Sequence, residues 1–273
     1  MELNTTYNIK ELEDNLSRLK TVDLKQESYE YIFELIKNIF SNIICQIIPV
    51  KVNPIFRGRI NENKSFNNIE QLIYPKPELL TKFGRLTKPK NPILYASQRE
   101  EIAIFEIQPK INDLITTVEF KLKPNIIDLQ TFEIGVREKF WNNIPHVLDR
   151  ESDIKISDEY REIVKKVESF FSDEFAQNIS ENETYRYKIT AAISEMTFIK
   201  NQFAECLLYP SIASFMDGLN VGIKPQVFLD KYFATRVTEF KVVSMYIKNN
   251  YKRYDVRCIK TTQKIDSNGF IEW

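Results

Sequence analysis

The sequence predicts an α+β fold in which helices and strands occur in separate clusters along the chain. Helical periodicity dominates the first 50 residues and the region from about 131 to 201. Stretches rich in Val, Ile, Phe and Thr, which are typical of strands, occur between about 54 and 129 and return after 206. Because single helices and strands do not alternate, this order argues against a doubly wound parallel sheet.

Composition limits the classes of function that the chain can have. Its 273 residues are enough for one large domain, and a content of 43% hydrophobic and 28% charged residues is typical of a folded globular protein. Basic and acidic residues number 38 each, so there is no net positive charge to hold a nucleic acid. We therefore expect no direct binding to nucleic acid.

Cysteine and histidine usage argues against several kinds of site. The three cysteines, Cys45, Cys206 and Cys258, are widely scattered, so neither a disulfide framework nor a Cys-x-x-Cys metal site is expected. The single histidine, His146, has no cysteine or second histidine beside it, whereas a zinc site, a Ser-His-Asp triad and a Cys-His dyad each need a histidine held by partners. With no signal-peptide pattern and no apolar stretch of membrane-spanning length, we expect a cytoplasmic protein without a membrane partner.

The chain is expected to open with a helical hairpin, an N-terminal extension that covers residues 1–50. One set of apolar residues recurs at helical spacing, namely Ile9, Leu12, Leu16 and Leu19. A second amphipathic run covers about 27 to 48. Pro54 ends the hairpin, and the segment Pro54-Ile-Phe-Arg-Gly-Arg is typical of a short strand closed by a glycine.

A loop, a strand and a helix are expected next. Residues 61 to 92 are punctuated by four prolines, Pro75, Pro77, Pro89 and Pro92, and show no low-complexity bias, which indicates a functional loop or lid rather than a linker. Residues 93–95 have the apolar character of a buried strand. Ser97 with Glu100 matches a capping box, which predicts a helix that carries Glu106.

The remaining elements are predicted as strands, then helices, then strands again. Strands are expected at 114–122 and 125–129. Helices are expected at 131–141, 157–176 and 183–201, with Ser157 as the cap of the second. Strands return at 206–209, 221–223, 234–246, 255–262 and 269–273.

Glu106 is the residue that most needs an explanation. It follows Ala103, Ile104 and Phe105, at a position where a core-facing helix should show another apolar side chain. Burying an unpaired acid costs on the order of several kcal/mol unless the acid stays protonated, so we expect a functional reason for it. A carboxylate in a semi-apolar cleft can stabilise positive charge on a sugar carbon as its leaving group departs.

Four other residues at strand and turn edges suit the same chemistry. Arg57 and Arg85 are of the type that grips phosphate with two parallel hydrogen bonds, and a glycine beside each lets the backbone approach. Tyr95 can stack on a ring, and Ser211 at a strand end can orient an amide or a ribose hydroxyl. Each has an ordinary structural alternative when taken singly. Together they favour cleavage of a glycosidic bond in a nucleotide.

The order and spacing of these residues resemble the RES family, which is named for an arginine, a glutamate and a serine in that order. The matching segments are Ile-Phe-Arg57-Gly-Arg, Tyr74-Pro75, Gly84-Arg85, Tyr95, Ala103-Ile-Phe-Glu106, Leu208-Tyr-Pro-Ser211 and Asp217-Gly-Leu-Asn220. The likeness extends from about Pro54 to Lys241. The chain departs from the family's pattern after Gly84-Arg85, where the usual asparagine, proline and glycine are replaced by Leu86-Thr87-Lys88-Pro89.

This resemblance implies an ADP-ribosyltransferase-like fold of mixed or antiparallel sheets with helices, in which residues 51–273 form a RES-like, NAD-binding catalytic domain. It implies NAD as the substrate, no metal, and a bacterial toxin that depletes NAD by hydrolysis or phosphorolysis with a helix-turn-helix antitoxin as its partner. By the same resemblance, Arg57 and Arg85 would hold the diphosphate and Tyr95 would line the ring or ribose pocket. Glu106 would stabilise the oxocarbenium-like state or orient water, and Ser211 would position the nicotinamide end.

Two other functions stay open from the sequence. The same cleft would also suit transfer of ADP-ribose to a macromolecule. A different class is a catalytically silent interaction module that binds a partner through an acidic middle segment, 133–186, or a basic C-terminal segment, 224–273. The sequence does not distinguish water from phosphate as the acceptor, and it does not set the oligomeric state.

Overall fold

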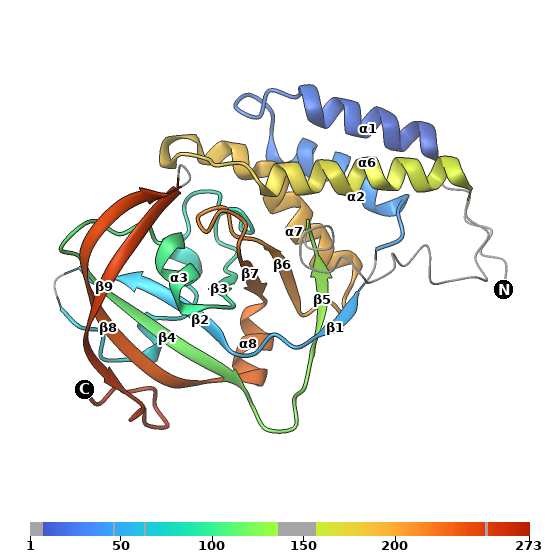
Figure 1. Ribbon diagram of the computed structural model, residues 1–273. Coiled ribbons are helices and arrows are strands. Elements are labelled where there is room, and N and C mark those ends of the chain that lie inside the picture. Colours follow the sequence, from blue (N-terminus) through green and yellow to red (C-terminus); the bar gives the residue numbers. More distant parts are fainter. Residues whose placement is uncertain (1–7, 46, 63, 136–156, 249–250) are drawn as a thin grey trace.

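The computed structural model describes residues 8–45, 47–62, 64–135, 157–248 and 251–273, and these form an α+β structure (Figure 1). Within those ranges the strands build one nine-stranded sheet in the order β1-β5-β6-β7-β3-β2-β4-β8-β9. All neighbouring pairs are antiparallel except β5 and β6, which are parallel. The strands are β1 Ile48–Val50, β2 Ile55–Ile60, β3 Leu94–Ser97, β4 Leu114–Leu122, β5 Leu129–Glu133, β6 Cys206–Pro210, β7 Leu219–Ile223, β8 Tyr232–Lys248 and β9 Tyr251–Thr262.

Six α-helices and three short 3-10 helices accompany this sheet in the described part of the chain. The α-helices are α1 Ile9–Thr21, α2 Tyr29–Ser41, α3 Glu100–Glu106, α6 Asp158–Phe175, α7 Lys188–Lys200 and α8 Pro225–Lys231. Short 3-10 helices are η1 Ile69–Gln71, η2 Pro77–Leu79 and η3 Glu181–Tyr187. Figure 1 shows α1, α2, α6 and α7 gathered together, with the long β8–β9 ribbon at the other side of the molecule.

The predicted N-terminal hairpin is confirmed as α1 and α2. Asn8 and Ser28 are the N-cap residues of its two helices, and their side chains accept hydrogen bonds from the backbone N–H groups of Glu11 and Tyr31. The apolar faces of both helices share one hydrophobic cluster with α6, α7 and the β6 residues Leu207 and Tyr209. Full burial of each leucine or isoleucine stabilises the fold by about 1.5–3 kcal/mol, so this cluster holds the hairpin firmly on the rest of the chain.

A glycine inside β2 allows α3 to lie close to the sheet. A Cβ on Gly58 would come within 2.9 Å of the backbone oxygen of Ala103 in α3. The strand continues past this glycine to Ile60, so our expectation that Gly58 closes the strand is wrong. The close approach holds α3 against β2, and Glu106 is the last residue of this helix.

Helices α6 and α7 confirm two further predictions, including Ser157 as a cap. The Ser157 side chain accepts a hydrogen bond from the backbone N–H of Tyr160, and α6 runs from Asp158 to Phe175. The third predicted helix, 183–201, is observed as η3 followed by α7. The loop predicted at 61–92 is also present, with only η1 and η2 inside it.

Several predicted elements are corrected by the structure. Ser97 lies in β3 and donates to the side chain of Asn220, while Arg99 precedes the first turn of α3 without a side-chain cap, so the capping box is wrong. The helix expected to reach residue 48 ends at Ser41, because the backbone then extends into β1. The strand predicted at 125–129 is instead β5, which begins at Leu129.

Strand β5 also replaces the start of the helix predicted at 131–141. Its residues pair with both β1 and β6, and this tertiary pairing outweighs the local helical pattern. The remainder of that predicted helix, from 136 on, and His146 lie outside the described residues. At the C-terminus, Phe270 and Ile271 form isolated bridges in place of the predicted strand 269–273. In the ranges described, none of the helices combines the length and the apolar character needed to cross a bilayer.

Candidate functional site

Glu106 lies at the end of α3 with its carboxylate held by two neighbours. Its Oε1 accepts a hydrogen bond from Ser211 Oγ at 2.5 Å and another from Asn220 Nδ2 at 2.6 Å. Ser211 follows β6 and is fully buried, and Asn220 lies in β7 and is 4% exposed. Two buried donors on one carboxylate oxygen fix the orientation of this side chain.

The second carboxylate oxygen of Glu106, Oε2, is open to a ligand. Among the described residues no hydrogen bond reaches Oε2 and no cation pairs with Glu106. The residue itself is exposed, whereas Ile102, Ala103 and Ile104 form the buried face of α3. The expectation that Glu106 occupies a core-facing position is therefore wrong, since the last turn of the helix opens onto a cleft.

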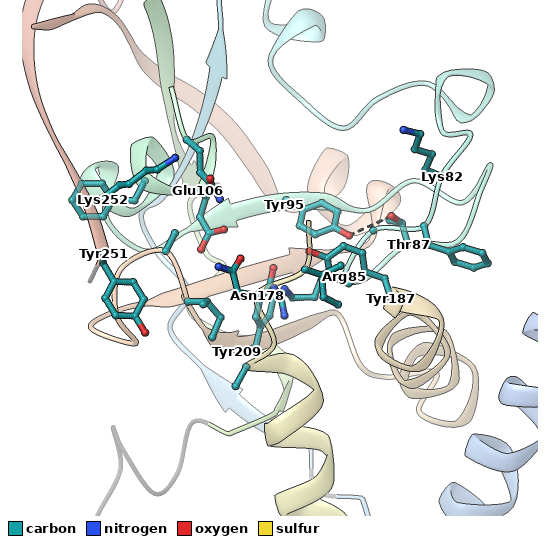
Figure 2. A pocket seen from close by; sticks show the side chains of 18 of the residues that line it. Lys82, Arg85, Thr87, Tyr95, Glu106, Asn178, Tyr187, Tyr209, Tyr251 and Lys252 are labelled. Atoms are coloured by element: carbon teal, nitrogen blue, oxygen red, sulfur yellow. Dashed lines mark hydrogen bonds between the residues drawn. The ribbon is translucent and has the colours of Figure 1, made fainter. Parts of the chain in front are cut away.

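Two cavities meet at Glu106. A large cleft of about 1170 Å³ is lined by residues from the 79–87 loop, α3, the segment after α6, the loop after β6, and β9. A smaller cavity of about 240 Å³ lies between β2, β3 and α3. Tyr95, Glu106 and Tyr209 line both. Figure 2 shows the Glu106 carboxylate between the β9 residues Tyr251 and Lys252 on one side and Tyr95 and Arg85 on the other.

Arg57 lines the small cavity together with Glu106. Its Nη1 donates to the backbone oxygen of Tyr95 at 2.6 Å. Its Nε is buried and has no hydrogen-bond partner among the described residues. Burial, and then the neighbouring charge of Arg59, lowers the pKa of Arg57 to about 10, so the guanidinium remains charged at neutral pH. Arg57 lines the small cavity as a residue, whereas its Nε is itself enclosed by the protein.

Tyr95 has a hydroxyl that is already engaged with the 84–87 turn. This hydroxyl accepts a hydrogen bond from the backbone N–H of Leu86 at 2.7 Å and lies 3.3 Å from Thr87 Oγ1. Burial raises the pKa of Tyr95 to about 12. The turn packs so closely that a Cβ on Gly84 would lie 2.7 Å from Thr87 Oγ1. Tyr95 therefore shapes the cleft wall and offers its ring face to a ligand.

Arg85 lines the large cleft but its guanidinium is bound to the protein. Nη1 donates to the backbone oxygen of Phe175 and Nη2 donates to that of Gln177 at 2.9 Å. Phe175 is the last residue of α6, so Arg85 satisfies carbonyl groups that the end of this helix leaves without partners. The guanidinium also lies 5.3 Å from the centroid of the Tyr187 ring.

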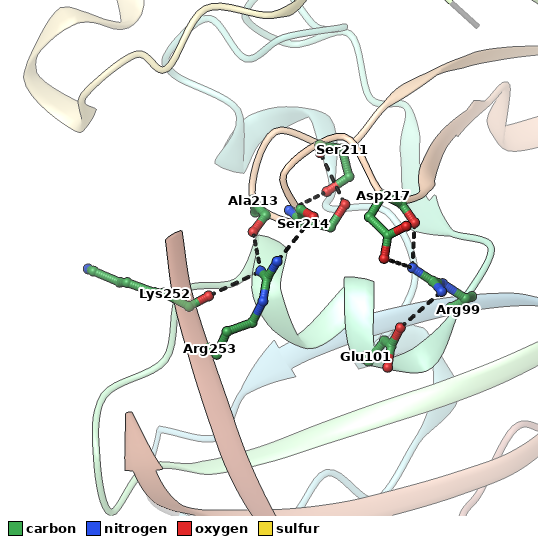
Figure 3. A network of polar contacts seen from close by, with 8 residues as sticks. All are labelled: Arg99, Glu101, Ser211, Ala213, Ser214, Asp217, Lys252 and Arg253. Carbon is green, nitrogen blue, oxygen red and sulfur yellow. Dashed lines mark hydrogen bonds and ion pairs between the residues drawn. The ribbon is translucent and has the colours of Figure 1, made fainter. Parts of the chain in front are cut away.

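Ser211 is connected to the site by its hydrogen bond to Glu106 and does not line either cavity. It is 0% exposed and lines neither cavity, so direct contact with a ligand is closed to it as placed. Its Oγ also accepts a hydrogen bond from the backbone N–H of Ser214 at 3.2 Å, as Figure 3 shows. The structure thus joins the predicted residues in two pairs, Glu106 with Ser211 and Arg57 with Tyr95, and places Arg85 on a separate wall of the cleft.

Sequence reasoning missed the role of Asn220. Its Nδ2 donates to Glu106, and its Oδ1 accepts from Ser97 Oγ at 2.8 Å, so it links two strands to the carboxylate. Ser97 and Asn220 are directly opposite each other in the β3–β7 pairing. The signal that could have found Asn220 was its place in the Gly-Leu-Asn segment, a polar residue within a buried apolar run.

No family model matches the sequence, and no curated protein matches it. Within the ranges that the structure describes, no three side chains of His, Cys, Asp or Glu gather closely enough to hold a metal ion.

Proposed function

We propose that this protein cleaves the bond between nicotinamide and ribose in NAD, with water or phosphate as the acceptor. The observation that carries the proposal is the position of the Glu106 carboxylate where two cavities meet. Ser211 and Asn220 hold its Oε1, and its Oε2 accepts no hydrogen bond from the described residues. A fixed negative charge beside a cavity stabilises a sugar carbon that becomes positive as its leaving group departs.

The small cavity suits the leaving group in size and in polarity. Its volume of about 240 Å³ leaves room for a single ring and lies below the range of about 300–1,000 Å³ for whole small-molecule sites. Arg57 and Asn220 border it, and Arg57 Nε is a donor without a partner among the described residues. The positive charge of Arg57 beside this cavity suits the carboxamide oxygen of nicotinamide, and the adjoining cleft leaves room for the rest of the dinucleotide.

The roles expected for two residues change in this proposal. Ser211 acts as a positioning residue that orients Glu106, because it is buried behind the carboxylate and does not line a cavity. Arg85 supports the wall of the cleft through the carbonyl groups of Phe175 and Gln177, and it is not the principal diphosphate ligand. Both changes follow from contacts that the sequence alone does not reveal.

The experiment that tests this proposal is release of nicotinamide from NAD by the purified protein. The wild-type protein is expected to release nicotinamide, and Glu106→Gln is expected to lower the rate by about 10²–10³-fold, as does loss of one electrostatic group in other active sites. Glu101→Gln is the matched control, because Glu101 lies on the same helix with a 57% exposed side chain and does not line the cleft. Absence of release by the wild-type protein would contradict the proposal.

Labelled NAD separates the alternatives in the same assay. Label that stays in small molecules supports hydrolysis or phosphorolysis, and dependence of the rate on added phosphate separates these two. Label that becomes attached to a protein or nucleic acid would show ADP-ribosyl transfer instead. A folded protein that binds no NAD would favour the silent interaction module.

The proposal extends to the fold and the biological setting that the resemblance implies. The mixed, largely antiparallel sheet is compatible with an ADP-ribosyltransferase-like fold, in which Arg57 lies on β2, Glu106 ends α3 and Ser211 follows β6. An enzyme of this kind would act as a bacterial toxin by depleting NAD, with a helix-turn-helix antitoxin as partner. Toxicity of the wild-type gene and not of the Glu106→Gln gene, on controlled expression, tests that setting.

A further inference from the structure

The β9 strand and the loop after β6 form a second wall of the large cleft. Tyr251 and Lys252 of β9 and Phe215 of the loop line it, and the Phe215 and Tyr251 ring centroids are 4.6 Å apart. Tyr251 and Lys252 lie beyond Lys241, where the likeness to the RES family ends. Nothing in that likeness assigns them a role.

The loop that carries Phe215 has an unusual backbone that its surroundings hold in place. Phe215 and Met216 have φ angles of 63° and 57°, a left-handed conformation that costs about 1–3 kcal/mol for a bulky residue. Arg253 donates to the backbone oxygens of Ala213 and Ser214, and Arg99 pairs with Asp217, as Figure 3 shows. These contacts hold the strained backbone in place, and Phe215 remains 47% exposed at the cleft.

The polar groups on this wall differ from those on the opposite wall of the cleft in the contacts that they make. Among the described residues Lys252 forms no ion pair. By contrast, the Arg85 guanidinium is bound to Phe175 and Gln177, and the Tyr95 hydroxyl is bound to Leu86. Figure 2 shows Tyr251 and Lys252 on the side of Glu106 away from Tyr95 and Arg85.

The cleft has room for a ligand larger than a single nucleoside. Its volume of about 1170 Å³ lies above the range of about 300–1,000 Å³ that small-molecule sites usually have. An aromatic pair beside an ammonium group that forms no ion pair with a described residue suits a base that stacks and a phosphate that carries negative charge. These are the two parts of a nucleoside monophosphate.

We propose that Phe215, Tyr251 and Lys252 form a subsite for the adenylate half of a dinucleotide, with the purine against the aromatic pair and the phosphate at Lys252. The assignment of the whole ligand as a dinucleotide rests on the proposed function. The subsite itself is testable without turnover, because adenosine monophosphate contains both groups that it recognises.

The test is the affinity of adenosine monophosphate and of adenosine, measured by calorimetry. Tyr251→Ala is expected to weaken the binding of both ligands about tenfold or more. Tyr251→Phe keeps the ring, so its affinities for both ligands are expected to stay within about twofold of wild type. Lys252→Met is expected to weaken adenosine monophosphate about tenfold and adenosine less than twofold, because only the first ligand carries a phosphate. Tyr246→Ala and Lys241→Met are the controls, since neither residue lines the cleft.

The outcomes separate this proposal from the proposed function. No binding of adenosine monophosphate by the folded wild-type protein, or equal affinities in wild type, Tyr251→Ala and Lys252→Met, would overturn the subsite. Release of nicotinamide with unchanged KM for NAD in Tyr251→Ala would also overturn it while leaving the proposed function intact. Binding that follows the expected pattern in a protein that releases no nicotinamide would keep the subsite and reject the proposed function.

Discussion

At the scale of single residues, the site depends on a carboxylate that is open to a cleft and held from behind. Glu106 is exposed, yet its Oε1 is bound by two buried side chains, Ser211 and Asn220. A carboxylate at a helix end needs no such support for stability alone. The support suggests that its orientation matters.

Removal of the Ser211 hydroxyl tests this support. Ser211→Ala takes away one of the two donors to Glu106 Oε1, and hydrogen bonds to charged groups are worth about 1.5–3 kcal/mol, so nicotinamide release is expected to slow by about 10–100-fold. KM for NAD is expected to change less than threefold, because Ser211 does not line a cavity. Steady-state kinetics check both values, and Ser244→Ala, on β8, serves as the control. A large rise in KM with unchanged kcat would show that Ser211 contacts the substrate.

How far the sequence predicts this site differs from residue to residue. Arg57, Tyr95, Glu106 and Ser211 could be named in advance because each is a polar residue at the edge of an apolar segment. The function of Asn220 and the engagement of Arg85 could not, because they depend on contacts across 114 and 90 positions of the chain. No local pattern carries such information, since it arises from tertiary packing.

At the scale of elements, the hairpin and the cleft loop are tied by a cluster of three side chains. Tyr29, the first residue of α2, donates from its hydroxyl to Glu195 Oε2 at 2.6 Å, and Lys88 Nζ lies 2.6 Å from Glu195 Oε1. Lys88 follows the Gly84-Arg85 turn on the same loop. The Tyr29 ring also lies 5.3 Å from that of Phe83, which lines the cleft. The N-terminal hairpin therefore buttresses one wall of the site.

Loss of the Glu195 carboxylate is expected to loosen this wall. Glu195→Ala leaves the Tyr29 hydroxyl and the Lys88 ammonium group without their partner, at a cost of about 1–3 kcal/mol in the free energy of unfolding. Urea unfolding measures that change. The KM for NAD is expected to rise as the loop moves, while Glu34→Ala on the exposed face of α2 leaves both quantities nearly unchanged. An unchanged unfolding free energy in Glu195→Ala would contradict this account.

The end of α6 contains an acid that makes stability depend on pH. Burial raises the pKa of Glu174 to about 7 from 4.5, an effect only partly offset by Arg186. Between these two values the folded state binds more protons than the unfolded state, so the free energy of unfolding falls as pH rises from 4.5 through 7.

Glu174→Gln removes this pH dependence. The variant is expected to match the wild-type protein near pH 4.5 and to be more stable by about 1–2 kcal/mol at pH 8, a value reduced for the partial exposure of the side chain. Thermal unfolding at both pH values checks the difference. Glu159→Gln, at the exposed first turn of the same helix, is the control. Equal stability of Glu174→Gln and wild type at pH 8 would contradict the shift.

At the scale of the whole molecule, the hairpin and the sheet share their hydrophobic core. The apolar residues of α1 and α2 lie in one cluster with α6, α7 and β6, so these two helices cover surface that would otherwise be exposed. Sequence periodicity predicts the helices, but it does not say what they cover. That information comes from packing, in which Phe40 lies against Phe132 and Phe171.

Deletion of residues 1–45 is expected to prevent stable folding. It uncovers the apolar faces of α6 and α7, and exposed patches of this kind promote aggregation. Solubility on expression and analytical size exclusion measure the outcome. A soluble, monomeric and fully folded protein after the deletion would show instead that the hairpin is an independent extension.

The most direct measurement of the central claim compares binding with chemistry in Glu106→Gln. Because Glu106 is proposed to stabilise charge that develops only in the transition state, the Kd for NAD of this variant, measured by calorimetry, is expected to stay within about threefold of wild type. Its rate of nicotinamide release in a single turnover is expected to fall at least about a hundredfold. A variant that releases nicotinamide at the wild-type rate, or that loses NAD binding and rate together, would contradict the claim.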